Sequence, residues 1–559
     1  MSKLASQRLF LLLLVVATLW TFSRVSQMGY VLWDDNVLVQ DNALLRLPWR
    51  QATTAMFGGF YSGDYMPLTL ASYWLELRLL AFGPAQQHGV NLALHLLNIV
   101  LLACWLRQIP WLRRWLPLIC AVFALHPVQV ESVAWISERK GLLASSLYFG
   151  AIWAALKVTT AKRYWWVYGL LYFGLFTGAA LAKANGLLIP CWLLALALLT
   201  SIKPRPAHAL KYALAVHLPV IAVAVVFAWV RTTAYASSIP TLAAAAIDTH
   251  HLRQLPESIA ASIGFYVKTM LWPSSLSIIY PPFVSAGPWH FETLLGTVTL
   301  IVALGCCYIK AWRHQALCWL FAGLTIAPVL QLIPRLNFVN DRYLYLPLIG
   351  CTAWLGLVFE YLARHYLPES LKHRALTIGP FLLAYLFIAL GCSASQERLT
   401  VWASNIALWS DTVAKTPHSS LAHNNLGQAL LSQGDRVAAR LAFESSISAE
   451  TVTPTGDNAA LNNLAMLHSD ATYPETFQLA TAAALLQRAV ALAPRPEEAF
   501  IPRFNLALVY LQASQAGQAL ALLHSLSQDL TSSGNQQFIL LRARTQALMT
   551  QLDGGLISQ

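Results

Sequence analysis

Long apolar runs, repeated along the first 395 residues, restrict this chain to folds that a lipid bilayer allows. Leu9–Trp20, Leu92–Leu106 and Leu187–Leu199 contain no aspartate, glutamate, lysine or arginine. Of all 559 residues, 57% are hydrophobic and 11% are charged, whereas soluble domains carry about 25% charged residues. Such runs are typical of membrane-spanning helices. We therefore expect an all-α, polytopic transmembrane helix bundle over residues 1–395.

The pattern of apolar segments predicts eleven membrane spans. A further segment, 256–273, is only moderately apolar and contains Lys268, which indicates a re-entrant or interfacial segment. The first run is expected to remain as an anchor, because no small-residue cleavage site follows it. The spans are expected near residues 9–26, 89–106, 115–126, 141–157, 165–181, 185–201, 212–231, 293–310, 315–334, 343–363 and 375–393.

Basic residues fall in short loops between the apolar segments, for example at Arg113, Arg114, Arg364 and Arg374. The positive-inside rule assigns such loops to the cytoplasm, which accounts for the net charge of +12 without a nucleic-acid partner. The predicted topology has the N-terminus inside and the C-terminus outside. The eight cysteines include no CxxC pair, so neither a disulfide framework nor a zinc site is predicted.

Composition changes near Gln396, where asparagine, glutamine, serine and alanine become frequent and hydrophobicity becomes periodic. Residues 396–559 are therefore expected to form a separate domain on the outer side of the membrane. Ala422–Gly427 begins the clearest tetratricopeptide-like helix pair. Such repeats stack into an α-solenoid, because each buries its apolar face against the next. They are expected near 421–453, 458–495 and 501–530, with a closing helix over 535–551.

Two adjacent carboxylates, Asp34 and Asp35, lie in the first predicted outer loop, residues 27–88. In one interpretation, one carboxylate removes a proton from an acceptor hydroxyl. The other would then hold the acceptor or raise the pKa of its neighbour by like-charge repulsion. In the other interpretation, both are solvated loop acids that cap the helix that follows.

The second outer loop and the start of the next span carry His126, Glu131, Arg139 and Lys140. Charged side chains at the ends of apolar segments need partners there. A functional interpretation has Arg139 or Lys140 bind an anionic phosphate while Glu131 contacts sugar hydroxyls. In the structural alternative, these side chains anchor the loop at the interface and form internal ion pairs.

Further candidates for an anionic ligand lie between later spans. Lys183 is expected on the outer side, where it could contact a lipid phosphate or snorkel to the interface. Asp341, Arg342 and Tyr345 start a span from outside. A guanidinium forks onto phosphate oxygens, so Arg342 is a candidate for the donor phosphate. The alternative is a structural pair between Arg342 and Asp341.

Two other groups have weaker functional signals. Lys268 and Tyr280 either belong to an interfacial belt or line a groove for a polyprenyl tail. His88, Asn91 and His95 share a helix face by their spacing. We expect them to make structural hydrogen bonds rather than bind a metal.

The outer-loop motifs follow a fixed order along the chain. Taken together, they resemble the bacterial branch of the transmembrane and tetratricopeptide-repeat-containing O-mannosyltransferase family. The resemblance covers nearly the whole chain. Its motifs are Trp33–Asn36, Asp64–Leu68, His88 with Asn91 and His95, His126–Pro127 with Glu131, Arg139–Lys140, Leu181–Lys183, Tyr266 with Trp272–Pro273, Tyr280–Pro281 and Asp341–Pro347.

This resemblance implies a GT-C fold and a reaction that inverts the anomeric centre of a sugar carried by polyprenyl phosphate. The acidic pair of the family maps onto Asp34 and Asp35, of which we favour Asp34 as the base. Two positions depart from the family pattern: Met66 replaces an arginine, and Gly141 replaces an aspartate. The donor sugar is therefore expected to be mannose or a pentose such as arabinofuranose.

The resulting expectation is a multi-pass glycosyltransferase of the bacterial inner membrane, with its repeats in the periplasm. Its acceptor would be a serine or threonine hydroxyl of an exported protein, such as a pilin, recruited by the repeats. No cofactor is required by this chemistry; a divalent cation is compatible with it, but no sequence motif indicates one. The alternatives are a GT-C transferase acting on a glycan or lipid, and a non-enzymatic membrane scaffold that assembles an envelope complex.

Overall fold

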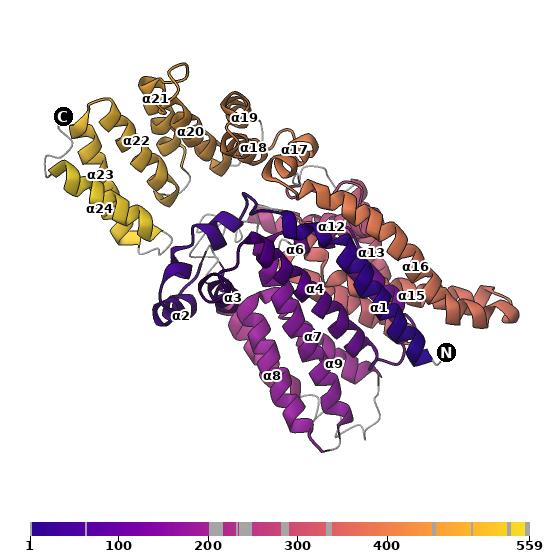
Figure 1. Cartoon of the computed structure of the whole chain (residues 1–559). Coiled ribbons are helices and arrows are strands. Elements are labelled where there is room, and N and C mark those ends of the chain that lie inside the picture. Colours follow the sequence, from indigo (N-terminus) through magenta and orange to yellow (C-terminus); the bar gives the residue numbers. More distant parts are fainter. Residues whose placement is uncertain are drawn as a thin grey trace. The chain divides into compact units, whose positions relative to one another are not determined.

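The structure is a computed structural model that describes residues 3–61, 64–161, 163–200, 216–230, 233, 249–280, 290–330, 338–449, 454–493, 496–533 and 538–553. Over these residues the chain is helical, with a single isolated bridge between Tyr61 and Asp64 and no strand (Figure 1). The predicted all-α class is therefore confirmed. Of the expected elements, the following residues lie outside the described ranges: 201, 212–215, 231, 331–334, 450–453, 494–495 and 535–537.

The chain divides into two compact units. The first contains Met1–Tyr30, Val37–Val39 and Leu44–Ala403. The second contains Val31–Asn36, Gln40–Ala43 and Ser404–Gln559. The acidic segment from the first predicted outer loop thus belongs to the unit formed by the C-terminal helices.

Over the described residues, the first unit is built from helices of different lengths. Its main helices are α1 (Lys3–Thr21), α2 (Trp49–Gly58), α3 (Pro67–Arg78), α4 (Pro84–Leu106), α5 (Leu116–Leu125), α6 (Gln129–Ala134), α7 (Arg139–Thr160), α8 (Trp165–Ala182), α9 (Ile189–Thr200), α12 (Thr249–Leu271), α13 (Phe291–Tyr308), α14 (Arg313–Ile326), α15 (Pro347–Tyr366) and α16 (Glu369–Val401). Short helical turns lie between these helices: η1 (Ser23–Gln27), η2 (Asn36–Gln40), η3 (Ala43–Arg46), η4 (Ile136–Glu138), η5 (Ala184–Gly186), η6 (Lys310–Trp312), η7 (Ala327–Val329) and η8 (Asp341–Leu344). Of these, η2 and η3 include residues of the second unit.

Within the described part of the chain, six helical segments are long and apolar enough to cross a membrane. They are Ser6–Gln27, Pro84–Leu106, Ile136–Val158, Trp165–Ala182, Phe291–Tyr308 and Glu369–Val401. Large apolar side chains are exposed on them, including Leu170, Ile301 and Leu382, as lipid-facing helix surfaces require. These features indicate a membrane protein, while the predicted count of eleven spans stays a prediction.

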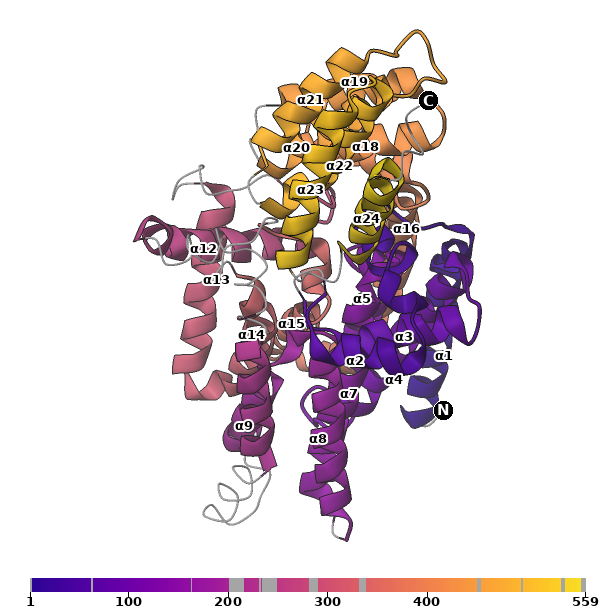
Figure 2. The same cartoon turned by 90° about the vertical axis from the view of Figure 1, so that its left-hand side faces the viewer.

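Helix α12 covers the segment for which a re-entrant or interfacial position was predicted. It is absent from the six candidate spans, and Figure 2 shows it lying across the direction of α7, α8 and α13. It packs closely on α13, because a Cβ atom added at Gly296 would lie 1.7 Å from the carbonyl oxygen of Ala260. Glycine at this crossing therefore lets the two backbones approach.

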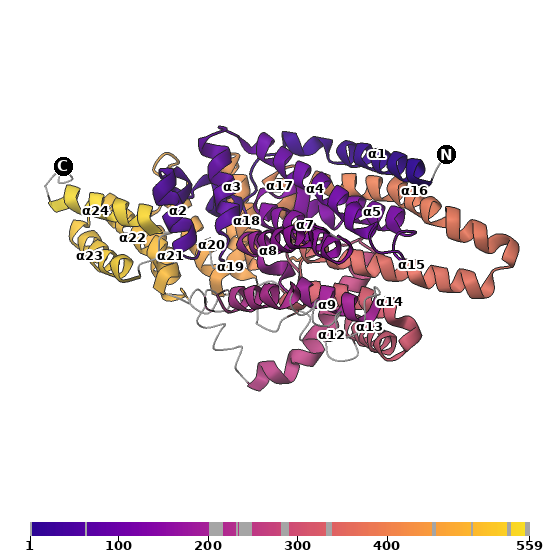
Figure 3. The same cartoon turned by 90° about the horizontal axis from the view of Figure 1, so that it is seen from below.

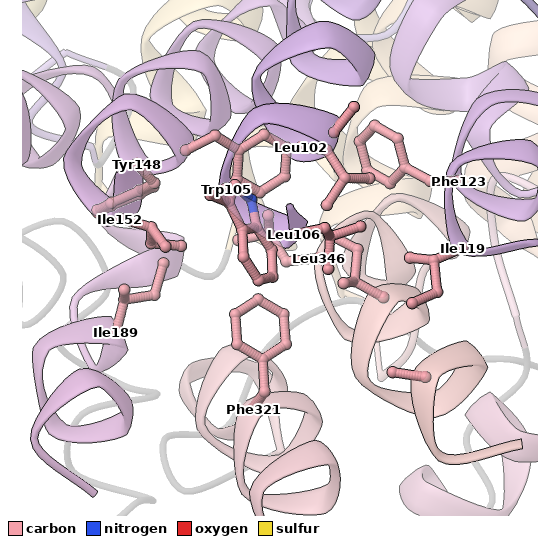
Figure 4. Packing of buried hydrophobic residues seen from close by; sticks show 14 of the residues in the cluster. Leu102, Trp105, Leu106, Ile119, Phe123, Tyr148, Ile152, Ile189, Phe321 and Leu346 are labelled. Atoms are coloured by element: carbon pink, nitrogen blue, oxygen red, sulfur yellow. The ribbon is translucent and has the colours of Figure 1, made fainter. Parts of the chain in front are cut away.

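A large apolar core joins the helices of the first unit. Leu102, Trp105 and Leu106 of α4 belong to one cluster with Phe123 of α5 and Phe321 of α14 (Figure 4). In lipid, such packing holds helices together by van der Waals contact, since no water is excluded. Helices α15 and α16 pack against each other and run side by side from a short connection (Figure 3).

The second unit is a succession of helices, each of which packs on the next. Ser404, Ser419 and Asp435 cap the first three by accepting a hydrogen bond from a backbone N–H of the first turn, which fixes where these helices begin. The helix pairs α18–α19, α20–α21 and α22–α23 overlap the residue ranges 421–453, 458–495 and 501–530, while the tetratricopeptide character of these ranges stays a prediction. The helices are α17 (Asn405–Lys415), α18 (Ser420–Ser432), α19 (Arg436–Ser448), α20 (Pro454–His468), α21 (Leu479–Ala491), α22 (Phe500–Gln512), α23 (Ala516–Ser533) and α24 (Ile539–Asp553).

Candidate functional site: a cationic cavity in the first unit

A cavity of about 170 Å³ lies in the first unit where several helices begin or end. Three cationic side chains from distant parts of the chain line it: Lys140, Lys183 and Arg342. The other lining residues are Asp64, Asn185, Thr325, Pro328, Val329, Tyr343, Tyr345 and Leu346. The predicted cations Lys140, Lys183 and Arg342 are therefore brought together, and Tyr345 lies with them.

The local sequence explains why these cations stand at helix ends. Lys140 is the second residue of α7. Helix α8 ends at Ala182, and Lys183 adopts an extended backbone conformation before the turn η5. Arg342 lies in η8, just before Pro347 starts α15, where proline is favoured at the first helical position.

Two buried glutamates hold Lys183 and Arg342 in place. Lys183 donates to Glu138 Oε1, and Arg342 Nη1 donates to Glu131 Oε1. The backbone N–H of Arg342 also donates to Glu131 Oε2 at 3.0 Å, and its Nε lies 3.9 Å from Glu138 Oε2. Both glutamates are about 2% exposed. Glu131, which was expected to contact sugar hydroxyls or make ion pairs, thus makes an ion pair here.

The ring of Trp135 contacts two of the cations, Arg342 and Lys140. The guanidinium carbon of Arg342 lies 5.0 Å from the ring centroid, and the Lys140 ammonium lies 5.8 Å from it. A cation over an aromatic face is attracted by the ring quadrupole. The Trp135 ring therefore helps to order two of the three cavity cations.

Burial and neighbouring charges shift the titration of this site. Burial lowers the pKa of the Lys183 ammonium, although Glu138 acts to raise it. Burial also acts to lower the pKa of Arg342, but Glu131 and other neighbours outweigh this, and the pKa is raised. Burial and the Glu131 carboxylate raise the pKa of Asp341 to about 7. The side chain of Asp341 accepts a hydrogen bond from the Tyr280 hydroxyl at 2.5 Å.

Arg139 lies beside Lys140 in sequence but does not line the cavity. Its guanidinium donates to Glu76, to Asn91 Oδ1 at 2.5 Å and to the carbonyl oxygen of Gln87 at 2.8 Å. Arg139 is 1% exposed. It therefore makes the internal ion pair that was one of its two predicted roles.

Three further predicted residues make contacts near the cavity without lining it. His126 Nε2 is 2.9 Å from the carbonyl oxygen of Met270, which links the end of α5 to α12. Lys268 pairs with Glu292 at 2.7 Å between α12 and α13. Tyr280 contacts the cavity region through Asp341. None of the three is among the residues that line the cavity.

A stripe of polar residues on α4 supports the cavity wall. The Tyr345 hydroxyl is 2.9 Å from His95 Nδ1 and accepts from Asn98 Nδ2 at 2.9 Å. His88 contacts the carbonyl oxygen of Gly29, and Asn91 donates to that of Trp135. These contacts agree with the structural hydrogen bonding expected for this helix face.

Sequence reasoning did not select Asp64, Glu138, Asn185 or Tyr343 as site residues. Asp64 and Tyr343 were visible as members of outer-loop motifs, and Glu138 directly precedes the basic pair. Asn185 stands in a turn between two apolar segments. A search for polar residues within three positions of each predicted cation would have found the last three.

The acidic pair lies in the second unit, and its two members differ in environment. Asp35 is fully buried and accepts a hydrogen bond from the backbone N–H of Val31 at 3.0 Å. It precedes η2 without making a capping hydrogen bond to that helix. Asp34 is partly exposed. Of the two, Asp34 is thus the more accessible to a ligand.

The described residues contain no group of three or more histidine, cysteine, aspartate or glutamate side chains arranged to hold a metal ion. Comparisons of the chain with protein-family models, with curated proteins and with solved structures found no match.

Proposed function

We propose that this chain is a GT-C membrane glycosyltransferase that moves a monosaccharide from polyprenyl phosphate to a serine or threonine hydroxyl of an exported protein. The observation that carries the proposal is the convergence of Lys140, Lys183 and Arg342 on one cavity. These side chains stand at the ends of helices in a unit with lipid-facing surfaces. A phosphate attached to a membrane lipid is the anion that such a position suits.

The proposed reaction begins when the sugar phosphate enters the cavity from the lipid phase. The Asp34 carboxylate removes the proton of the acceptor hydroxyl, and the hydroxyl oxygen forms a bond to the anomeric carbon. The bond between that carbon and the phosphate oxygen breaks, and its electron pair leaves with the lipid phosphate. Lys140, Lys183 and Arg342 stabilise the charge that develops there. Attack from the opposite side inverts the anomeric centre.

The second unit would present the acceptor protein. Its helix pairs coincide with the sequence periods of tetratricopeptide repeats, and solenoids of such repeats offer extended surfaces to proteins. We propose that these helices form the predicted solenoid on the periplasmic side of a bacterial inner membrane. The first unit would then cross that membrane eleven times, with its N-terminus in the cytoplasm. The order of the outer-loop motifs supports the same family of reactions.

The test is transfer by the purified full-length chain in lipid nanodiscs. Polyprenyl phosphate bearing mannose or arabinofuranose serves as the donor, and peptides from exported proteins serve as acceptors. Asp34→Asn should lower kcat by about 10²–10⁴-fold, the usual contribution of a positioned base. Asp41→Asn, an exposed acid of the same loop, is the matched control and should retain activity. Near-normal transfer by Asp34→Asn would remove Asp34 from this role.

A further inference from the structure

The acidic segment is attached to the first helix of the second unit. The backbone N–H of Leu32 donates to the side-chain oxygen of Asn405 at 2.6 Å, a contact between residues 373 positions apart. The ring of Trp33 lies 5.5 Å from the ring of Trp409, which is fully buried. Two consecutive residues before Asp34 are therefore fixed by two residues of α17.

The two anchoring residues are arranged to act together. Ser404 caps α17 by accepting from the backbone N–H of Ala407, so Asn405 stands at the first helical position. Trp409 follows four residues later, and residues at this spacing lie on one face of a helix. Asn405 holds the backbone of the segment, while Trp409 packs against the side chain of the next residue.

The segment itself is closed into a compact turn. The Asp35 carboxylate accepts from the backbone N–H of Val31 at 3.0 Å and is fully buried. Asp34 lies between the packed Trp33 and the buried Asp35. Its backbone is therefore fixed on both sides, while its own side chain remains partly exposed.

We infer that Asn405 and Trp409 are positioning residues for Asp34, and that the proposed base is carried by the unit that presents the acceptor. This inference rests on the proposed function. The donor-binding cations belong to the first unit and the base to the second. Loosening the segment should therefore lower the rate of the chemical step and leave donor binding nearly unchanged, since misplacing a catalytic group costs rate rather than ground-state affinity.

The experiment compares Asn405→Ala with Asn405→Asp in the full-length chain in nanodiscs. Alanine removes the acceptor for the Leu32 N–H, and kcat should fall by about 10- to 100-fold with a donor KM within about twofold of wild type. Aspartate keeps an oxygen at this place, and a carboxylate suits the first turn of a helix, so its kcat should stay close to that of wild type. Hydrogen exchange at residues 31–36 should become faster only in Asn405→Ala.

Phe500→Leu is the control for a general weakening of the second unit. Phe500 is buried elsewhere in that unit, where its ring packs on Phe538. An equal fall of kcat in Phe500→Leu and Asn405→Ala would overturn the inference, as would unchanged exchange at 31–36 or no rescue by aspartate. If the wild-type chain transfers no sugar, the proposed function fails, whereas the exchange data still decide whether Asn405 fixes the segment.

Discussion

Replacing Arg139 by methionine should destabilise the first unit far more than it affects donor binding. Arg139 is 1% exposed and its partner Glu76 is 4% exposed. The substitution removes the ion pair and the hydrogen bonds to Asn91 and Gln87. Removing one partner of a buried ion pair costs about 3–5 kcal/mol, because the other charge is left without compensation. We expect a loss of this size near neutral pH.

The loss should depend on pH in a defined direction. Burial raises the pKa of Glu76 above its ordinary value of 4.5, and Arg139 counteracts this. Without Arg139 the pKa rises further, so the folded state keeps a proton that the unfolded state releases. Stability then falls as pH rises above the unfolded pKa. The Arg139→Met penalty should therefore be larger at about pH 8 than at about pH 5.

The assay is the free energy of unfolding in mixed micelles for Arg139→Met, Glu76→Gln and the double variant. The double variant should recover about 1–3 kcal/mol relative to Arg139→Met, because no buried carboxylate remains. A penalty below about 1 kcal/mol at pH 8, or an equal penalty with and without the Glu76 carboxyl group, would refute the buried-pair reasoning.

Three further predictions address the cavity and the helix packing. Lys140→Met should raise the KM for the lipid-phosphate donor about 10- to 100-fold, the value of one charge-assisted hydrogen bond of about 1.5–3 kcal/mol. An unchanged KM would count against the cavity as the phosphate site. Burial and Glu131 raise the pKa of Asp341 to about 7 in the folded state, whereas the unfolded carboxyl group has a pKa of about 4. The stability of the wild-type chain should therefore fall as the pH rises from about 4 towards 7. Asp341→Asn should flatten this slope in pH-dependent unfolding measurements. Gly296→Ala should cost about 1–3 kcal/mol by overpacking in the same unfolding assay, because the new Cβ would meet the carbonyl oxygen of Ala260. Gly305→Ala in the same helix, where nothing lies within 4 Å, should cost nothing.

The helical class and the candidate cations could be predicted because both leave local signals. Apolar runs mark helices in lipid, and charges at their ends stand out against them. No local sequence pattern indicates which of these cations meet in one cavity. Lys140, Lys183 and Arg342 come from distant parts of the chain, and only the packed bundle brings them together.

Even for two neighbouring residues of one helix, the sequence did not indicate which of them faces the cavity. Arg139 and Lys140 are adjacent, but successive side chains of an α-helix point about 100° apart. One therefore reaches Glu76 of α3 while the other lines the cavity. The sequence alone contains the basic pair but not the direction of each member.

The attachment of the acidic segment depends on a contact that no short-range pattern contains. Leu32 and Asn405 are 373 residues apart, and a predicted outer loop of the membrane domain gave no reason to group residues 31–36 with the C-terminal helices. The sequence did show that the two aspartates lie together. Their different burial, with Asp35 enclosed and Asp34 partly exposed, required the fold.

Mass spectrometry of exported proteins tests the central claim most directly. The proteins would be compared between cells with the wild-type chain, cells without it and cells with Asp34→Asn at equal expression. We predict that one monosaccharide mass is present on serine or threonine residues of specific peptides in the first sample and absent from the other two. Identical modified peptides in all three samples would contradict a glycosyltransferase that acts on exported proteins.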